Sequence, residues 1–182
     1  TEVLNDADYE MFRKIIYDES GITFSATNRS ILDSRIKELL RKKNIATPGE
    51  YYAIITKNTE EMKEMLDSVT TNLTRFFRNQ PHFDAFVNYV IPSVAELKKA
   101  RGPDRTIKIW SAGCSTGEEP YTIAMLMKEI CPPGFNFQII ASDISLKSLM
   151  TAKQGFYPDN RIEGIPANYL QKYFTKVDGG YQ

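Results

Sequence analysis

The chain has 182 residues, enough for one sizeable domain or two small ones, and its 42% hydrophobic and 25% charged residues are typical of a globular protein. Its 23 basic and 23 acidic residues cancel, which argues against a protein that coats nucleic acid, because such binding needs many phosphate contacts. With no run of 18 apolar residues and no signal-peptide pattern, we expect no membrane insertion. One histidine and two separated cysteines argue against a zinc site or a catalytic triad, and we expect both thiols to be free.

The first seventy residues have the apolar spacing of amphipathic helices. Asn5 or Asp6 can cap a first helix that Gly21 closes, and a second helix is predicted from about 29 to 43. Thr47-Pro-Gly-Glu50 has the pattern of a capping box and predicts the start of a third helix.

Thr59 is predicted to cap a fourth helix. We therefore expect a small, all-helical N-terminal domain over residues 1–72. A polar hinge at 70–74 leads into Arg75-Phe-Phe-Arg78. A long helix is predicted from about Pro81, with a kink or interruption at Pro92.

After the breaker Arg101-Gly-Pro-Asp-Arg105, the pattern changes to strand, small-residue loop, helix and strand. The first strand and its loop lie within Ile107–Tyr121, and the second strand, Phe137–Ser142, runs into Asp143. This order is typical of a nucleoside-binding βαβ unit. The loop lacks both the G-x-G-x-x-G spacing and the P-loop lysine that bind phosphates in other proteins. It therefore favours a ligand that contains a nucleoside but no pyrophosphate.

Several polar residues of this unit have both a functional and a structural interpretation. Asp143 can accept bonds from both hydroxyls of a ribose, or it can cap the helix that follows. Glu118 and Glu119 stand where a helix begins; one can simply complement the helix dipole while the other holds the amino group of an amino-acid ligand. Arg78 can grip a carboxylate in a fork or form an interdomain salt bridge.

The second predicted helix carries a cluster of cations against only two acids. Such a cluster is either a solvated face or a docking surface for an acidic partner. The tail from Gly155 to Gln182 predicts a short helix at Tyr169–Phe174 and a hairpin-like turn at the end. Since only two strands of a doubly wound sheet are accounted for, we expect the chain to stop before that fold is complete.

Three segments, Thr70–Arg78, Ile109–Tyr121 and Ala141–Ile144, together resemble the chemotaxis receptor methyltransferases, the CheR family. The tail segments Ala152–Tyr157 and Leu170–Phe174 also fit that family. The resemblance implies an α+β/α/β protein, with the small helical domain followed by the first βαβ part of a class I, Rossmann-like methyltransferase domain over residues 73–182. It also implies that the chain ends inside a β-subdomain inserted after the second strand.

The resemblance further implies transfer of a methyl group from S-adenosyl-L-methionine to glutamates of chemoreceptors, with S-adenosyl-L-homocysteine as product. It implies that Arg78 serves the active site. The implied cofactor-binding residues are Asn72, Thr74, Arg78, Ala112, Gly113, Glu118, Glu119 and Asp143. The implied receptor-docking residues are Arg29, Arg35, Lys37, Arg41 and Lys42.

The expected partners are the cytoplasmic helices of methyl-accepting chemoreceptors, and the protein is expected to be cytoplasmic and monomeric. No metal and no nucleic acid are expected. Two alternatives stay open: a truncated or degenerate homologue that binds receptor or cofactor without catalysis, and a methyltransferase that acts on another substrate, such as nucleic acid.

Overall fold

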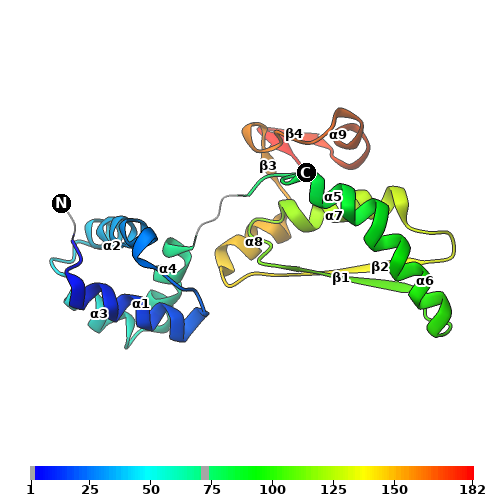
Figure 1. Cartoon of the computed structure of the whole chain (residues 1–182). Coiled ribbons are helices and arrows are strands. Elements are labelled where there is room, and N and C mark those ends of the chain that lie inside the picture. Colours follow the sequence, from blue (N-terminus) through cyan, green and yellow to red (C-terminus); the bar gives the residue numbers. More distant parts are fainter. Residues whose placement is uncertain (1–2, 71–73) are drawn as a thin grey trace. The chain divides into compact units, whose positions relative to one another are not determined.

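The computed structural model describes residues 3–70 and 74–182, and the chain forms two compact units (Figure 1). The main body of the first unit is residues 1–71, and that of the second is Asn72–Asp143 with Lys147–Gln182. Among the described residues, no helix is both long and apolar enough to span a membrane.

The N-terminal unit is made of helices. They are α1 (Asp6–Ser20), a 3-10 turn (Ala26–Asn28), α2 (Arg29–Lys43), α3 (Pro48–Ile55) and α4 (Thr59–Val69). Their apolar faces meet in one core whose largest fully buried side chains include Phe12, Leu32, Ile36 and Tyr51. The predicted helical domain is thus confirmed in fold class, and its helices are held together by burial of these faces.

Capping side chains fix the ends of these helices. The Asn5 side chain accepts a bond from the Asp8 backbone N–H at 2.8 Å, and Gly21 ends α1 with φ 74°. Thr47 and Glu50 form the predicted capping box at α3. The prediction for α4 was wrong by one residue: the cap is Asn58, because its side-chain oxygen accepts bonds from two backbone N–H groups of the first turn.

In the C-terminal unit, the predicted long helix has three parts. These are α5 (Gln80–Ala85), a π-helical turn (Phe86–Val90) and α6 (Ile91–Arg101). Pro92 directly follows the π-helical turn, in which the Ile91 N–H bonds the Phe86 carbonyl, and a widened turn accommodates a residue without an N–H. The predicted interruption is therefore present, as a widened turn just before the proline.

Two parallel strands follow. β1 (Thr106–Ala112) leads into α7 (Glu118–Ile130), which crosses over to β2 (Asn136–Ser142). The register pairs Thr106 with Asn136 and Ala112 with Ser142, so both strands end at the same level. This confirms the predicted βαβ unit and places the loop after β1 beside the residue after β2.

One face of this strand pair is covered by helices, as Figure 1 shows for α6 and α7. Ile91 of α6 and Ile123 and Met127 of α7 pack with Ile107 of β1 in one apolar cluster. The side chains that alternate with this face point away from the cluster: Trp110 is 70% exposed and Ile140 is 52% exposed.

After β2 come α8 (Leu146–Gln154) and, in the tail, a small antiparallel sheet. Its strands are β3 (Tyr157–Pro158), β4 (Lys176–Val177) and β5 (Gly180–Tyr181), in the order β3-β5-β4, with a 3-10 turn (Asp159–Arg161) and α9 (Ala167–Tyr173) between β3 and β4. The predicted short helix and terminal hairpin are both present. Phe76, Met125 and Tyr157 form the buried cluster beneath this tail.

Candidate cofactor site

The loop at residues 113–117, which we call the cofactor loop, connects β1 to α7. The backbone N–H groups of Gly113 and Cys114 both donate to the Ser142 carbonyl, at 2.8 and 2.9 Å, so the loop turns over the end of β2. The loop also contains positive φ angles, 48° at Ser115 and 100° at Gly117. A side chain at 117 would place its Cβ 2.7 Å from the Tyr157 hydroxyl, which explains the small residue there.

Asp143 follows β2 and binds the cofactor loop directly. Its Oδ2 accepts a bond from the Ser115 backbone N–H at 2.7 Å, and the side chain is half-buried. Ala112 and Gly113, at the start of the loop, are exposed. The structure thus brings together three of the residues predicted to bind the cofactor; their contacts with a ligand stay predictions.

The two adjacent glutamates have different surroundings. Glu118 is fully buried, and its two carboxylate oxygens accept bonds from the Thr116 hydroxyl at 2.9 and 2.7 Å. Arg161 donates to the same carboxylate at 2.7 Å. Glu119 is exposed and accepts a bond from the Ser111 hydroxyl at 2.6 Å. Of this pair, Glu119 is the carboxylate that a ligand can reach.

Cys114 lies inside the cofactor loop but is buried. Burial, with a further contribution from nearby Asp143, raises the pKa of its thiol, so it stays protonated and supplies small volume. Both cysteines are free. Within residues 3–70 and 74–182, no cluster of three or more His, Cys, Asp or Glu side chains is placed to hold a metal ion.

The segment Arg75–Arg78 is anchored to α7 through Phe77. The Phe77 backbone N–H donates to the Thr122 hydroxyl at 3.2 Å, and that hydroxyl donates to the Glu118 carbonyl at 2.7 Å. Thr74 is half-buried and Arg78 is exposed. Asn72, also predicted to bind the cofactor, lies outside the described residues.

The sequence did not indicate that the tail contacts the cofactor loop. The Tyr157 hydroxyl donates to the Thr116 carbonyl at 2.7 Å, and Arg161 reaches both Thr116 and Glu118. These residues lie more than forty positions from their partners, and no local pattern marks such a pairing.

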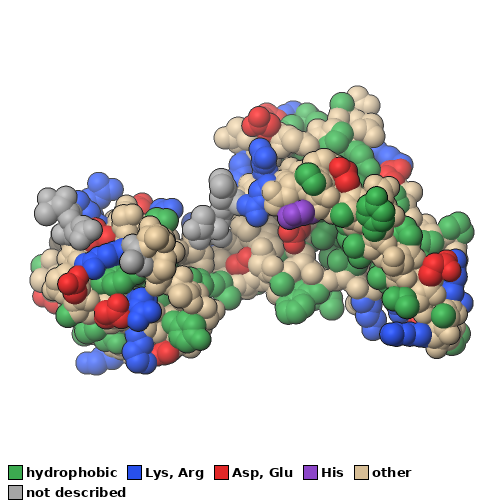
Figure 2. Space-filling view, viewed as in Figure 1, with side chains coloured by type: hydrophobic (Ala, Val, Ile, Leu, Met, Phe, Trp, Pro, Cys, Tyr) green, Lys and Arg blue, Asp and Glu red, His purple; other side chains and the backbone are tan. Residues whose placement is uncertain are grey.

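The predicted docking residues on α2 are not equivalent. Arg29 donates to Asp6 and lies over the Tyr9 ring at 4.8 Å, and Arg35 lies 3.5 Å from Glu38. Lys42 pairs with Glu64 of α4 at 2.7 Å. Lys37 and Arg41 are exposed, and neither has an ion pair within the described part of the chain. On the visible face of the N-terminal unit, basic and acidic side chains are interspersed (Figure 2).

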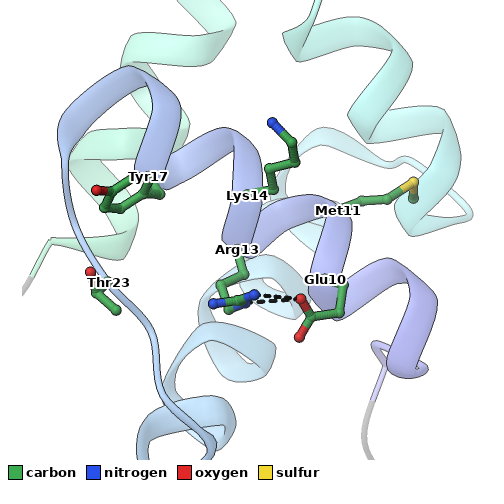
Figure 3. A pocket seen from close by; sticks show the side chains of 6 residues that line it. All are labelled: Glu10, Met11, Arg13, Lys14, Tyr17 and Thr23. Carbon is green, nitrogen blue, oxygen red and sulfur yellow. Dashed lines mark hydrogen bonds and ion pairs between the residues drawn. The ribbon is translucent and has the colours of Figure 1, made fainter.

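A cavity of about 450 Å³ lies on the N-terminal unit, along α1 (Figure 3). It is lined by Glu10, Met11, Arg13, Lys14, Tyr17 and Thr23. Its charges are paired locally, because Arg13 binds Glu10 at 2.7 Å and Lys14 binds Asp18 at 2.6 Å. None of the residues predicted to bind cofactor or receptor lines it.

Two family models match the chain. The model for the CheR methyltransferase all-alpha domain matches residues 7–70, and the model for the CheR methyltransferase SAM binding domain matches residues 72–182. S-adenosyl-L-methionine (SAM) is therefore the cofactor that the second region is built to bind.

Curated relatives agree with these models. A chemotaxis protein methyltransferase of Borreliella burgdorferi is 38% identical over 169 residues, covering 90% of this chain and 59% of that relative. Chemotaxis protein methyltransferase 2 of Pseudomonas aeruginosa is 33% identical, and the match covers 94% of this chain and 59% of that relative. A chemotaxis protein methyltransferase of Escherichia coli is 31% identical, and the match covers 98% of this chain and 60% of that relative. The chain thus spans about three-fifths of the length of these relatives.

Proposed function

Because the chain belongs to the CheR methyltransferase family, we propose that it provides the cofactor-binding part of an enzyme that methylates glutamate side chains of chemoreceptors. The products are glutamate methyl esters and S-adenosyl-L-homocysteine. The observation that carries this proposal is the cofactor loop bound to Asp143 across the aligned ends of β1 and β2. Ligands of open α/β sheets bind at this edge of the strands.

The chemistry of methyl transfer to a carboxylate suits these residues. Glutamate is ionised at pH 7, so the nucleophile needs no general base. The protein has to hold the carboxylate in line with the methyl group and exclude water. We assign Arg78 to orienting a carboxylate or a cofactor group, since arginine does not lose its proton usefully. Glu119 is assigned to the ammonium of the methionine part, because it is exposed beside the cofactor loop.

The proposed partners are the cytoplasmic helices of chemoreceptors, which places the protein in the cytoplasm. Lys37 and Arg41 support this choice, because two exposed cations without ion pairs in the described part of the chain suit an acidic helical surface. Arg29, Arg35 and Lys42 are engaged within the N-terminal unit and contribute less.

Calorimetric titration with SAM tests cofactor binding. Asp143→Ala should weaken binding by roughly 1–3 kcal/mol, the cost of leaving ribose hydroxyls unpaired. Asp84→Ala is the control, because Asp84 is an exposed acid on α5 whose side chain accepts a bond from Gln80. Absence of binding heat with folded protein would contradict the proposal, and unchanged affinity in Asp143→Ala would remove Asp143 from the site.

Transfer of labelled methyl groups tests the substrate. Receptor fragments should be labelled with base-labile esters, whereas RNA should not. Cofactor binding without transfer to either would favour a homologue that binds without catalysis.

A further inference from the structure

We propose that Tyr157 and Arg161 of the tail are positioning residues that hold the cofactor loop in its binding conformation and so set the affinity for SAM. The inference rests on the proposed function for the identity of the ligand. Tyr157 and Arg161 both contact Thr116, the residue before Gly117 in the cofactor loop.

Tyr157 holds the backbone of the cofactor loop. Its hydroxyl donates to the Thr116 carbonyl at 2.7 Å, and its side chain is 2% exposed. Burial, reinforced by the nearby Glu118 charge, raises the pKa of this phenol, so it remains a donor throughout the physiological range. The ring is fixed in turn by an edge-to-face contact with Phe76, with 4.8 Å between centroids.

Arg161 holds the side chains of the same turn. Its Nη2 lies 2.7 Å from Oε1 of Glu118 and 3.3 Å from the Thr116 hydroxyl. Glu118 is fully buried, so its charge needs a partner, and within the described residues Arg161 is the cation bonded to it. The guanidinium therefore joins the last residues of the loop to the first residue of α7.

These contacts restrain the cofactor loop at Thr116, one residue after the residue that Asp143 binds. Asp143 binds the Ser115 N–H, while the tail binds the carbonyl and hydroxyl of Thr116. The loop needs such restraint because Ser115 has a positive φ, which an unrestrained non-glycine residue rarely adopts. A loop ordered before the ligand arrives loses less entropy on binding, so the restraint raises affinity.

A second, more exposed ion pair between the tail and α7 provides a control. Lys172 of α9 binds Glu129, near the other end of α7, at 2.7 Å. It joins the same two parts of the chain without touching the cofactor loop. If the tail acted only as a general tether, removing either pair would have the same effect on the loop.

The test compares Arg161→Gln, Arg161→Lys and Lys172→Gln by SAM titration and by hydrogen exchange of the Ser115 and Gly117 amides without ligand. We expect the Kd for SAM to rise about tenfold in Arg161→Gln, because a tenfold change corresponds to the usual cost of an unpaired buried polar group. In Lys172→Gln the Kd should stay within about twofold of that of the unmodified protein. Arg161→Lys should recover part of the affinity, because an ammonium can still pair with Glu118. Exchange of the two amides should accelerate only when Arg161 is replaced.

Equal effects of Arg161→Gln and Lys172→Gln on affinity, or unchanged loop exchange in both Arg161 variants, would overturn the inference. Arg161→Lys retains a cation, so it keeps the test valid if Arg161→Gln does not fold. Failure of the unmodified protein to bind SAM would instead contradict the proposed function, while the exchange measurement still decides whether Arg161 orders the loop.

Discussion

At the first turn of α7, two neighbouring glutamates differ in their burial and in their bonding partners. Glu118 is buried against Arg161, whereas Glu119 is exposed and bonded to Ser111. Glu119→Gln keeps the shape and the acceptor for Ser111 but removes the charge, so it should lower SAM affinity about tenfold with an unchanged unfolding temperature. Glu118→Gln should also lower the unfolding temperature, because it removes half of the buried pair with Arg161.

Calorimetry and thermal unfolding of these two variants check the assignment. Unchanged SAM binding in Glu119→Gln would remove Glu119 from the ligand. The sequence alone left the two residues open, since both stand at the start of a helix. Burial and bonding partners in the folded chain distinguish them: Arg161 binds Glu118, and Ser111 of β1 binds Glu119.

At the scale of helices, α2 and α4 are joined by charges that make the N-terminal unit sensitive to acid. Lys42 and Lys43 donate to Glu64 at 2.7 and 2.6 Å, and these bonds lower the pKa of Glu64 from 4.5 to about 2. A depressed folded-state pKa means that the stabilisation is present above about pH 4.5 and is lost as the pH falls toward 2. The effect is modest because Glu64 is 38% exposed.

As the pH is lowered from 4.5 to 2, the unfolding temperature of the N-terminal unit should therefore decrease less in Glu64→Gln than in the unmodified protein. Circular dichroism at a series of pH values measures it. Glu60→Gln serves as control, because Glu60 is an exposed acid that pairs with Lys63 on the surface of the same helix. Parallel curves for Glu64→Gln and the unmodified protein would contradict the assignment.

The outer face of α2 is where receptor docking is expected. Reversing two exposed cations of α2, Lys37→Glu with Arg41→Glu, should slow association with an acidic receptor fragment at low salt and leave SAM affinity unchanged. The difference should shrink as salt is added, since exposed charges are screened. Lys14→Glu, on α1, is the control; an equal loss there would indicate a general charge effect rather than a docking face.

Helix ends were predictable where the signal is local. Asn5, Gly21 and the Thr47–Glu50 box act within three or four residues, and the structure confirms them. The cap of α4 was misplaced because Asn58 and Thr59 are both good capping residues, and the sequence does not say which one faces the free N–H groups. The Pro92 interruption was predictable, but its form as a π-helical turn was not.

At the scale of the whole molecule, the N-terminal helices have a core of their own. In the part of the chain that the structure describes, buried hydrophobic side chains from Leu4 to Val69 form one cluster. A fragment of residues 1–70 should therefore fold alone, with helical circular dichroism and a cooperative thermal transition of low midpoint, as expected for so small a core. A fragment without a cooperative transition would contradict this, and the full chain measured in parallel is the control.

The parts of the site that sequence could not predict are those that distant segments build together. The loop, Asp143 and the following helix form one βαβ pattern, so their proximity followed from strand order. Tyr157 and Arg161 reach the loop only because the tail packs on Phe76 and Met125 through an aromatic cluster, which no periodicity encodes. Long-range pairing of this kind depends on tertiary packing rather than on local preference.

The exposed indole on β1 has a practical consequence. Trp110 is the only tryptophan in the chain, and its Nε1–H donates to the Ser142 hydroxyl at 3.0 Å, one residue before Asp143. All tryptophan emission therefore originates at the end of the strand pair that holds the cofactor loop. A fluorescence titration of the unlabelled protein reads out this one edge of the sheet, so binding and loop variants can be compared optically without introducing a probe.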